Sequence, residues 1–87
     1  MDIRDEVRAF VVDHFYVPAE LRLGDGDSLL DQGIVDSTGV LEIITFLEER
    51  FGFAVEDSEV VPENLDSIER ISAYAARKRT AGERPAA

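Results

Sequence analysis

The sequence contains no cysteine, no tryptophan and a single histidine in 87 residues. Without cysteine the chain can form no disulfide, no thiolate zinc site and no cysteine nucleophile, so any thiol chemistry needs a thiol supplied from outside the chain. No apolar run approaches the ~20 residues of a membrane-spanning helix, and the start of the chain lacks the basic and apolar stretches of a secretory signal. We therefore expect a soluble, cytoplasmic protein.

Basic side chains are also scarce. The chain has nine of them and 19 acidic side chains, so its net charge is −10. Such a charge is repelled by nucleic acid and by anionic membranes, and it favours a basic protein partner. Residues 1–69 hold 18 of the acids and four basic residues, whereas residues 70–87 hold one acid and five basic residues. A chain of this length forms one small core without an interdomain cleft, so an elaborate enzyme pocket is not expected.

Apolar residues recur at helical spacing in three segments. Residues 2–16 predict a helix that ends near Val17-Pro18, since the residue before proline avoids the helical region. Ser37–Phe51 predicts a second helix, closed by a left-handed Gly52. A last helix follows Asp66-Ser67-Ile68-Glu69, which fits a capping box. The residues expected to point inward from that helix are Ile68, Ile71, Tyr74 and Ala75.

The first two helices are separated by a long connection, from Pro18 to Asp36, whose leucines predict that it packs on the core. Pro62–Leu65 fits one helical turn with proline at its start. The expected fold class is all-α, a small four-helix bundle with three main helices, one short helix and a long first loop. The domain should cover residues 1–79, followed by a flexible tail at 80–87. The predicted core brings together Phe10, Ile43, Leu47, Phe51, Ile68 and Ile71.

Signals for catalysis or for metal binding are weak. A hydrolase that used Ser37 and His14 would need a Gly-x-Ser-x-Gly elbow, but Val35 stands where the first glycine belongs. A calcium loop starting at Asp25 fails because Leu29 cannot ligate and Leu30 replaces the glycine that the turn requires. No catalytic residue and no metal ion are expected.

The residues Asp36-Ser37-Thr38-Gly39 stand where the long loop meets the second helix. An isolated Asp-Ser pair in such a place is an ordinary helix cap. Here, however, a phosphodiester on the Ser37 hydroxyl would lie at the positive end of the helix, where free backbone N–H groups favour an anion. The small residues Thr38 and Gly39 would leave that hydroxyl approachable.

Over about residues 3–79 the chain resembles the acyl carrier proteins, four-helix carriers that bear phosphopantetheine. The matching motifs are Asp31-Gln32-Gly33-Ile34-Val35-Asp36-Ser37, Leu41-Glu42-Ile43-Ile44, Leu47-Glu48-Glu49-Arg50-Phe51-Gly52 and Val61-Pro62-Glu63-Asn64-Leu65-Asp66-Ser67-Ile68. The resemblance implies that a phosphopantetheinyl transferase esterifies Ser37 with 4'-phosphopantetheine from coenzyme A, and that Asp36 assists this magnesium-dependent attachment. The thiol of the arm would then hold an acyl or aminoacyl group as a thioester, and the protein would be a non-catalytic carrier.

The same resemblance implies a set of partner enzymes. A loading ligase or adenylating enzyme would charge the arm, and an acyltransferase or synthase would take the group onward, with the carrier acting as a monomer. Thr38-Gly39 and Thr45 depart from many fatty-acid carriers, which favours a specialised pathway such as polyketide or nonribosomal peptide assembly. The residues expected to contact partners are Thr38, Val40, Leu41, Glu42, Thr45, Glu48, Glu49 and Glu63.

One interpretation without a cofactor stays open at this point. The chain could be an acidic helical adaptor, or a nucleic-acid mimic, that fills a basic groove in a partner protein. A mimic should spread its acids as phosphates are spread, whereas acids here also stand at helix starts, where they stabilise the helices.

Overall fold

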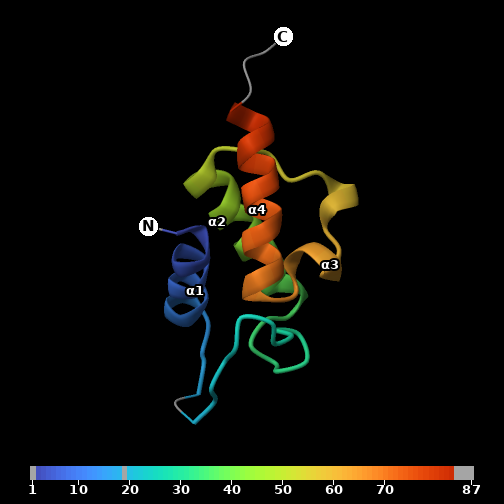
Figure 1. The fold of residues 1–87 in the computed structure, drawn as a ribbon. Coiled ribbons are helices and arrows are strands. Elements are labelled where there is room, and N and C mark those ends of the chain that lie inside the picture. The colour runs from blue at the N-terminus through green and yellow to red at the C-terminus, as the bar shows by residue number, and fades with distance from the viewer. Residues whose placement is uncertain (1, 19, 84–87) are drawn as a thin grey trace.

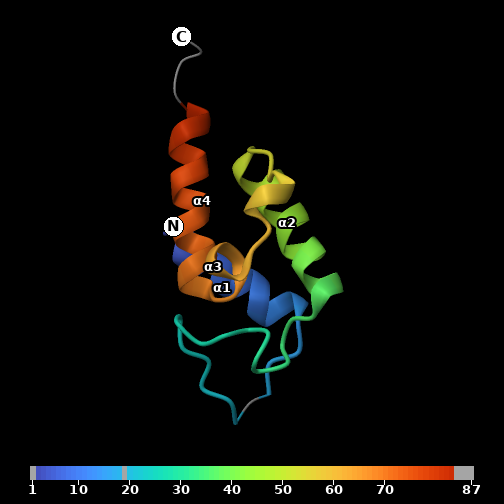
Figure 2. The ribbon, with the colours of Figure 1, turned by 90° about the vertical axis from the view of Figure 1, so that its right-hand side faces the viewer.

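The computed structural model describes residues 2–18 and 20–83 of the chain. They form α1 (Ile3–His14), α2 (Ser37–Phe51), the 3-10 turn η1 (Asp57–Glu59), α3 (Pro62–Leu65) and α4 (Ile68–Glu83). The helix α4 stands at the centre of Figure 1, with α1 on one side of it and α3 on the other. Figure 2 shows α2 running beside α4 in the same direction. The predicted all-α fold, with three main helices and one short one, is confirmed.

The limits of α2 agree with the sequence prediction. Asp36 precedes the helix with extended backbone, and Gly52 ends it at φ +75°, with its N–H bonded to the Glu48 carbonyl at 3.0 Å. A glycine suits this left-handed position because it has no Cβ. The helix α1 is shorter than the predicted span 2–16, because the backbone is already extended at Phe15.

The predicted capping box at the start of α4 is wrong. The Ser67 hydroxyl does accept the N–H of Arg70 at 3.0 Å, but the residue at that third position is arginine, so no glutamate side chain can return the bond. The Asp66 carboxylate instead accepts from Ser28 and Leu30 of the long loop. At its other end α4 continues to Glu83, beyond the boundary expected at residue 79. Residues 84–87 of the expected tail lie outside the described residues.

The hydrophobic core draws side chains from every α-helix and from the long loop. Four buried residues come from that loop, which confirms that the loop packs on the core. The inward residues predicted for α4 are all buried, and Tyr74 is among the largest fully buried side chains. The buried apolar residues are Val7, Val11, Leu23, Leu29, Ile34, Val35, Ile43, Leu47, Leu65, Ile68, Ile71, Tyr74 and Ala75.

Two of the six residues predicted to converge in the core lie at its edge. Ile43, Leu47, Ile68 and Ile71 are at most 1% exposed, whereas Phe10 and Phe51 are partly exposed and pack against the buried cluster from outside. Their rings stack with other aromatic rings along the side of α2. A bundle this small has too little interior for every aromatic ring, so its large side chains also cover the rim of the core.

Hydrogen bonds fasten the long loop to the start of α4. The N–H of Leu29 donates to the Asp66 carbonyl at 2.7 Å, and the N–H of Glu69 donates to the Asp25 carbonyl at 2.8 Å. The Asp25 carboxylate pairs with Arg8 and, at 3.6 Å, with Arg4 of α1. The loop thereby joins α1 to α4, at the end of the bundle where α2 begins (Figure 1).

Within the described ranges, none of the helices combines the length and the apolar character that crossing a lipid bilayer would need.

Two leucines on α2 allow a matched test of the core. Replacing the buried Leu47 by alanine should lower the free energy of unfolding by about 2–5 kcal/mol, because it leaves a cavity at the centre of the bundle. Leu41 is 62% exposed on the same helix, and its replacement by alanine should cost less than ~0.5 kcal/mol. Urea unfolding followed by circular dichroism measures both; equal losses would contradict this placement of the core.

Candidate functional site

Ser37 is the first residue of α2 and is exposed to solvent. The preceding Asp36 caps the helix, since its carboxylate accepts the N–H of Gly39 at 2.8 Å. No hydrogen bond within the described part of the chain involves the Ser37 hydroxyl. The first N–H groups of a helix have no intrahelical acceptor and carry partial positive charge. Ser37 therefore presents a free hydroxyl at a position that favours an attached anion.

An apolar groove of about 310 Å³ begins at Ser37. Its walls come from the long loop, α2, the connector that precedes α3, and α3 itself. Leu30, Leu41 and Val60 are exposed large apolar side chains, and all three lie in this groove. The lining residues are Leu30, Ser37, Val40, Leu41, Val60, Val61, Pro62, Leu65 and Asp66.

The loop wall of the groove is fixed by Asp66. One carboxylate oxygen accepts the Ser28 hydroxyl at 2.6 Å, and the other accepts the N–H of Leu30 at 3.0 Å. Hydrogen bonds to a charged acceptor are stronger than those between neutral groups. Leu30 is therefore held beside Ser37 although it lies in a loop.

The opposite wall depends on Glu59 in the connector. One of its carboxylate oxygens accepts from the N–H of Glu56, the Tyr74 hydroxyl and the Lys78 ammonium, each at 3.0 Å. The bond from Glu56, followed by that from Lys78, lowers the pKa of Glu59. Burial and the neighbouring Glu59 raise the pKa of Tyr74, so its hydroxyl stays protonated and donates. These bonds tie the connector to α4 behind the groove.

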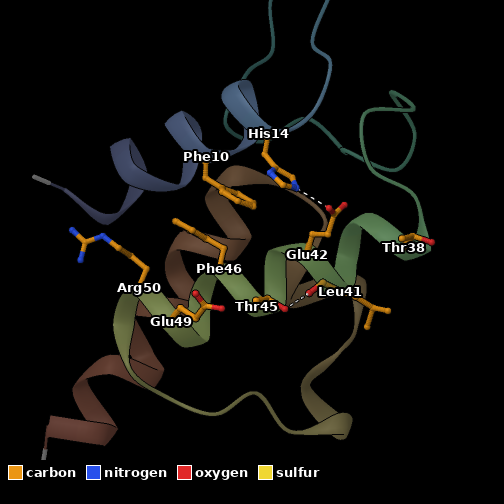
Figure 3. Close-up of a pocket in the computed structure, with 9 residues that line it drawn as sticks. All are labelled: Phe10, His14, Thr38, Leu41, Glu42, Thr45, Phe46, Glu49 and Arg50. Carbon is orange, nitrogen blue, oxygen red and sulfur yellow. Dashed lines mark hydrogen bonds and ion pairs between the residues drawn. The ribbon is translucent and has the colours of Figure 1, made fainter.

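A second hollow, of about 710 Å³, lies between α1 and α2. In Figure 3 the Phe10 ring lies between those of His14 and Phe46; the ring centroids of Phe10 and Phe46 are 4.1 Å apart. A 2.7 Å bond joins His14 Nε2 to Glu42, and Arg50 pairs with Glu6. The remaining lining residues are Thr38, Leu41, Thr45 and Glu49.

The residues expected to contact partners fall into three places. Thr38, Leu41, Glu42, Thr45 and Glu49 line the hollow between α1 and α2, while Val40, together with Leu41, lines the groove at Ser37. Glu63 is exposed at the start of α3. Glu48 is partly buried, and its carboxylate accepts the N–H of Val55 at 2.9 Å, so this acid is engaged in holding the chain after α2.

Several lining residues were not among the sequence-predicted site residues. Leu30 and Val60 lie in segments without periodicity, so nothing in the local pattern showed that they are exposed beside Ser37. Phe10 is predicted from its spacing to lie in the core, and Phe46 lies within the predicted helix Ser37–Phe51, so local spacing did not mark either ring as lining a hollow. The pairing of His14 with Glu42 joins two helices and has no signal in either one alone.

The hydrolase and calcium interpretations gain no support from the geometry. The His14 ring is bonded to Glu42 in the second hollow, whereas Ser37 lines the other groove. Asp25 is paired with arginines and Asp27 accepts the N–H of Gly24 at 2.8 Å. Among the described residues, no three acidic or histidine side chains are arranged to hold a metal ion.

The family model described as "Phosphopantetheine attachment site" matches residues 5–75, which is most of the chain and includes Ser37 and both walls of its groove. The chain belongs to the phosphopantetheine-binding carrier proteins. The cofactor of this carrier is therefore covalently attached 4'-phosphopantetheine. An exposed serine at a helix start fits the attachment of a phosphodiester, because the N–H groups there favour an anion.

Similar proteins include both acyl and D-alanyl carriers. The carrier is 36% identical over 74 residues to the acyl carrier protein of Campylobacter hominis, covering 85% of this chain and 90% of that protein. It is 43% identical over 51 residues to the D-alanyl carrier protein of Abiotrophia defectiva, covering 59% of this chain and 65% of that protein. The acyl carrier protein of Sinorhizobium fredii is 36% identical over 56 residues, covering 64% and 70%.

The pairing of Glu59 predicts a pH dependence of stability. Because folding lowers the pKa of Glu59 below its ordinary value of 4.5, its contribution is present above that value and is lost as the pH falls through the folded pKa. The variant Glu59→Gln should therefore be less stable than the wild type at neutral pH, and the difference should shrink in acid. Urea midpoints between about pH 3 and pH 7 measure this. Asp57→Asn, an exposed control in the same turn, should have urea midpoints close to those of the wild type. A difference between Glu59→Gln and the wild type that stays constant across this pH range would contradict the assignment.

Proposed function

We propose that Ser37 is the attachment residue and that the protein shuttles a small acyl or aminoacyl group between enzymes. The free, exposed hydroxyl of Ser37 at the start of α2 is the observation that carries the proposal. Support comes from the apolar groove that begins at this residue and from the family match that spans it. The thiol that the chain lacks would be supplied by the arm, and it would hold the group as a thioester.

Attachment would be a phosphoryl transfer performed by a phosphopantetheinyl transferase. The Ser37 oxygen forms a new bond to the phosphorus that carries the pantetheine in coenzyme A, the bond to the nucleotide breaks, and the hydroxyl proton is removed. Asp36 would assist the magnesium-dependent step, because one carboxylate oxygen holds the N–H of Gly39 and the carboxylate remains exposed. The resulting phosphodiester would be stabilised by the N–H groups of α2.

Thr38, Gly39 and Thr45 differ from the residues of many fatty-acid carriers, and part of the chain is similar to a D-alanyl carrier. These two observations favour a specialised pathway over housekeeping fatty-acid synthesis, and we expect that pathway to be cytoplasmic. A ligase or adenylating enzyme would load the arm, and an acyltransferase or synthase would unload it. The protein itself would contribute recognition and presentation, without catalysing either reaction.

The partner face would be the exposed side of α2 with the start of α3. Glu42, Glu49 and Glu63 are exposed there, and Leu41 adds an apolar contact. Exposed ion pairs are individually worth at most ~1 kcal/mol, so several acids would steer basic partners towards the carrier and still allow rapid release. A shuttle that meets several enzymes in turn needs both properties.

Replacement of Ser37 by alanine tests the attachment site. Incubation with coenzyme A and a permissive phosphopantetheinyl transferase should add one phosphopantetheine mass to the wild type and none to Ser37→Ala, as read by intact mass spectrometry. Ser58→Ala, which removes another exposed serine hydroxyl, should be modified like the wild type. A wild type that stays unmodified with several transferases, or a modified Ser37→Ala protein, would refute the proposal.

Reversal of one charge tests the partner face. Glu49→Lys should slow modification by the transferase several-fold at low salt, because it removes an attractive charge from the exposed side of α2, and the difference should shrink as salt screens it. The Glu49 side chain makes no hydrogen bond or ion pair within the described part of the chain, so its replacement should leave the fold intact. Glu20→Lys, which changes an exposed acid of the long loop, is the matched control. Equal rates for the two variants at low salt would count against steering by α2.

A further inference from the structure

Gly39 is an unexpected residue in the first turn of α2. It is buried, and it is the only glycine inside this helix. Glycine weakens a helix relative to alanine because its backbone loses more freedom on folding. Its φ angle is not positive, so the backbone conformation does not require glycine. The reason for the glycine must therefore lie in what surrounds it.

The space beside Gly39 is too small for a methyl group. A Cβ built on this residue would lie 2.9 Å from Cε1 of Phe15 and 3.0 Å from Cγ1 of Val35. Carbon atoms in favourable contact lie about 3.5–4.0 Å apart. At Gly26, by contrast, a Cβ would meet only the end of the Glu69 side chain, at 3.4 Å. The absence of a side chain at Gly39 thus lets the first turn of α2 touch Phe15 and Val35.

Neither neighbour can yield freely. The backbone of Phe15 is fixed by its N–H, which donates to the Val11 carbonyl at 3.0 Å, and its ring meets that of Phe10 edge-on at 5.9 Å. Val35 is 4% exposed, and its N–H donates to the Leu29 carbonyl at 3.2 Å. An added methyl group would therefore displace the first turn of α2.

Gly39 is also directly connected to the residues of the attachment site. Its N–H is the group that the Asp36 carboxylate accepts, and Ser37 lies between these two residues in the chain. A shift of Gly39 would move the Asp36 carboxylate and the Ser37 hydroxyl together, relative to the groove walls that Leu30 and Val60 provide.

We propose that Gly39 is a positioning residue for phosphopantetheine attachment, holding Ser37 and Asp36 in place by allowing α2 to touch Phe15 and Val35. The proposal rests on Ser37 as the attachment residue. It also gives a structural reason for the glycine at this position, where the chain departs from many fatty-acid carriers. In this chain Phe15, at the end of α1, and Val35 lie against Gly39 and leave no room for a side chain.

The experiment compares Gly39→Ala with the wild type in the transferase reaction. A misplacement of ~1 Å can cost about a hundredfold in rate, so a shift of a few tenths should lower kcat about three- to tenfold with little change in KM for the carrier. The melting temperature should change little, because alanine favours the helix while the contact disfavours it. A purely structural role would instead lower the melting temperature and leave kcat unchanged, which would overturn the proposal.

Two further variants complete the test. Gly26→Ala should match the wild type in both kcat and melting temperature. Phe15→Leu removes the ring atoms that the new methyl group meets, while the Val35 contact at 3.0 Å remains, so adding it to Gly39→Ala should restore part of the lost kcat. If Gly39→Ala does not fold, the double variant decides: a folded protein modified within about threefold of the wild-type rate supports the proposal, and a slower or unfolded one overturns it. A wild type that is not modified at Ser37 would instead refute the proposed function.

Discussion

The position of Leu29 governs much of this structure. Its side chain is fully buried although it lies in a loop, its N–H donates to Asp66, and its carbonyl accepts the N–H groups of Ile34 and Val35. A buried backbone segment is stable only when its polar groups are bonded, and here the loop and the start of α4 satisfy one another. The loop can therefore act as part of the core without forming a helix or strand.

The proposed attachment site at Ser37 depends on that arrangement for its shape. The residue after Leu29 reaches the groove at Ser37, and Val35 meets the helix turn at Gly39. Glu59 fixes the other wall through Tyr74 and Lys78 of α4. A serine on a freely moving helix end would offer a transferase many geometries, whereas a helix start held on two sides offers few.

The acidic residues divide into those that hold the fold and those left for partners. Asp25, Glu48, Glu59 and Asp66 accept hydrogen bonds that fasten one segment to another, and Asp36 caps α2. Only part of the net charge of −10 is then available to partners on the exposed side of α2 and at the start of α3. The overall charge is thus a poor measure of the docking surface, because many acids serve the structure.

Local patterns in the sequence predicted the helices, Ser37 as the candidate site and most of the core. Local signals suffice for these features: the spacing of apolar residues, Asp36 before α2 and Gly52 after it act within a few residues. The tertiary structure alone decided the edge positions of Phe10 and Phe51, the use of Asp66 by the loop, and the contact that explains Gly39. Each of these features depends on contacts between residues far apart in the chain. The spacing of side chains along one helix does not show which other segment will pack against it.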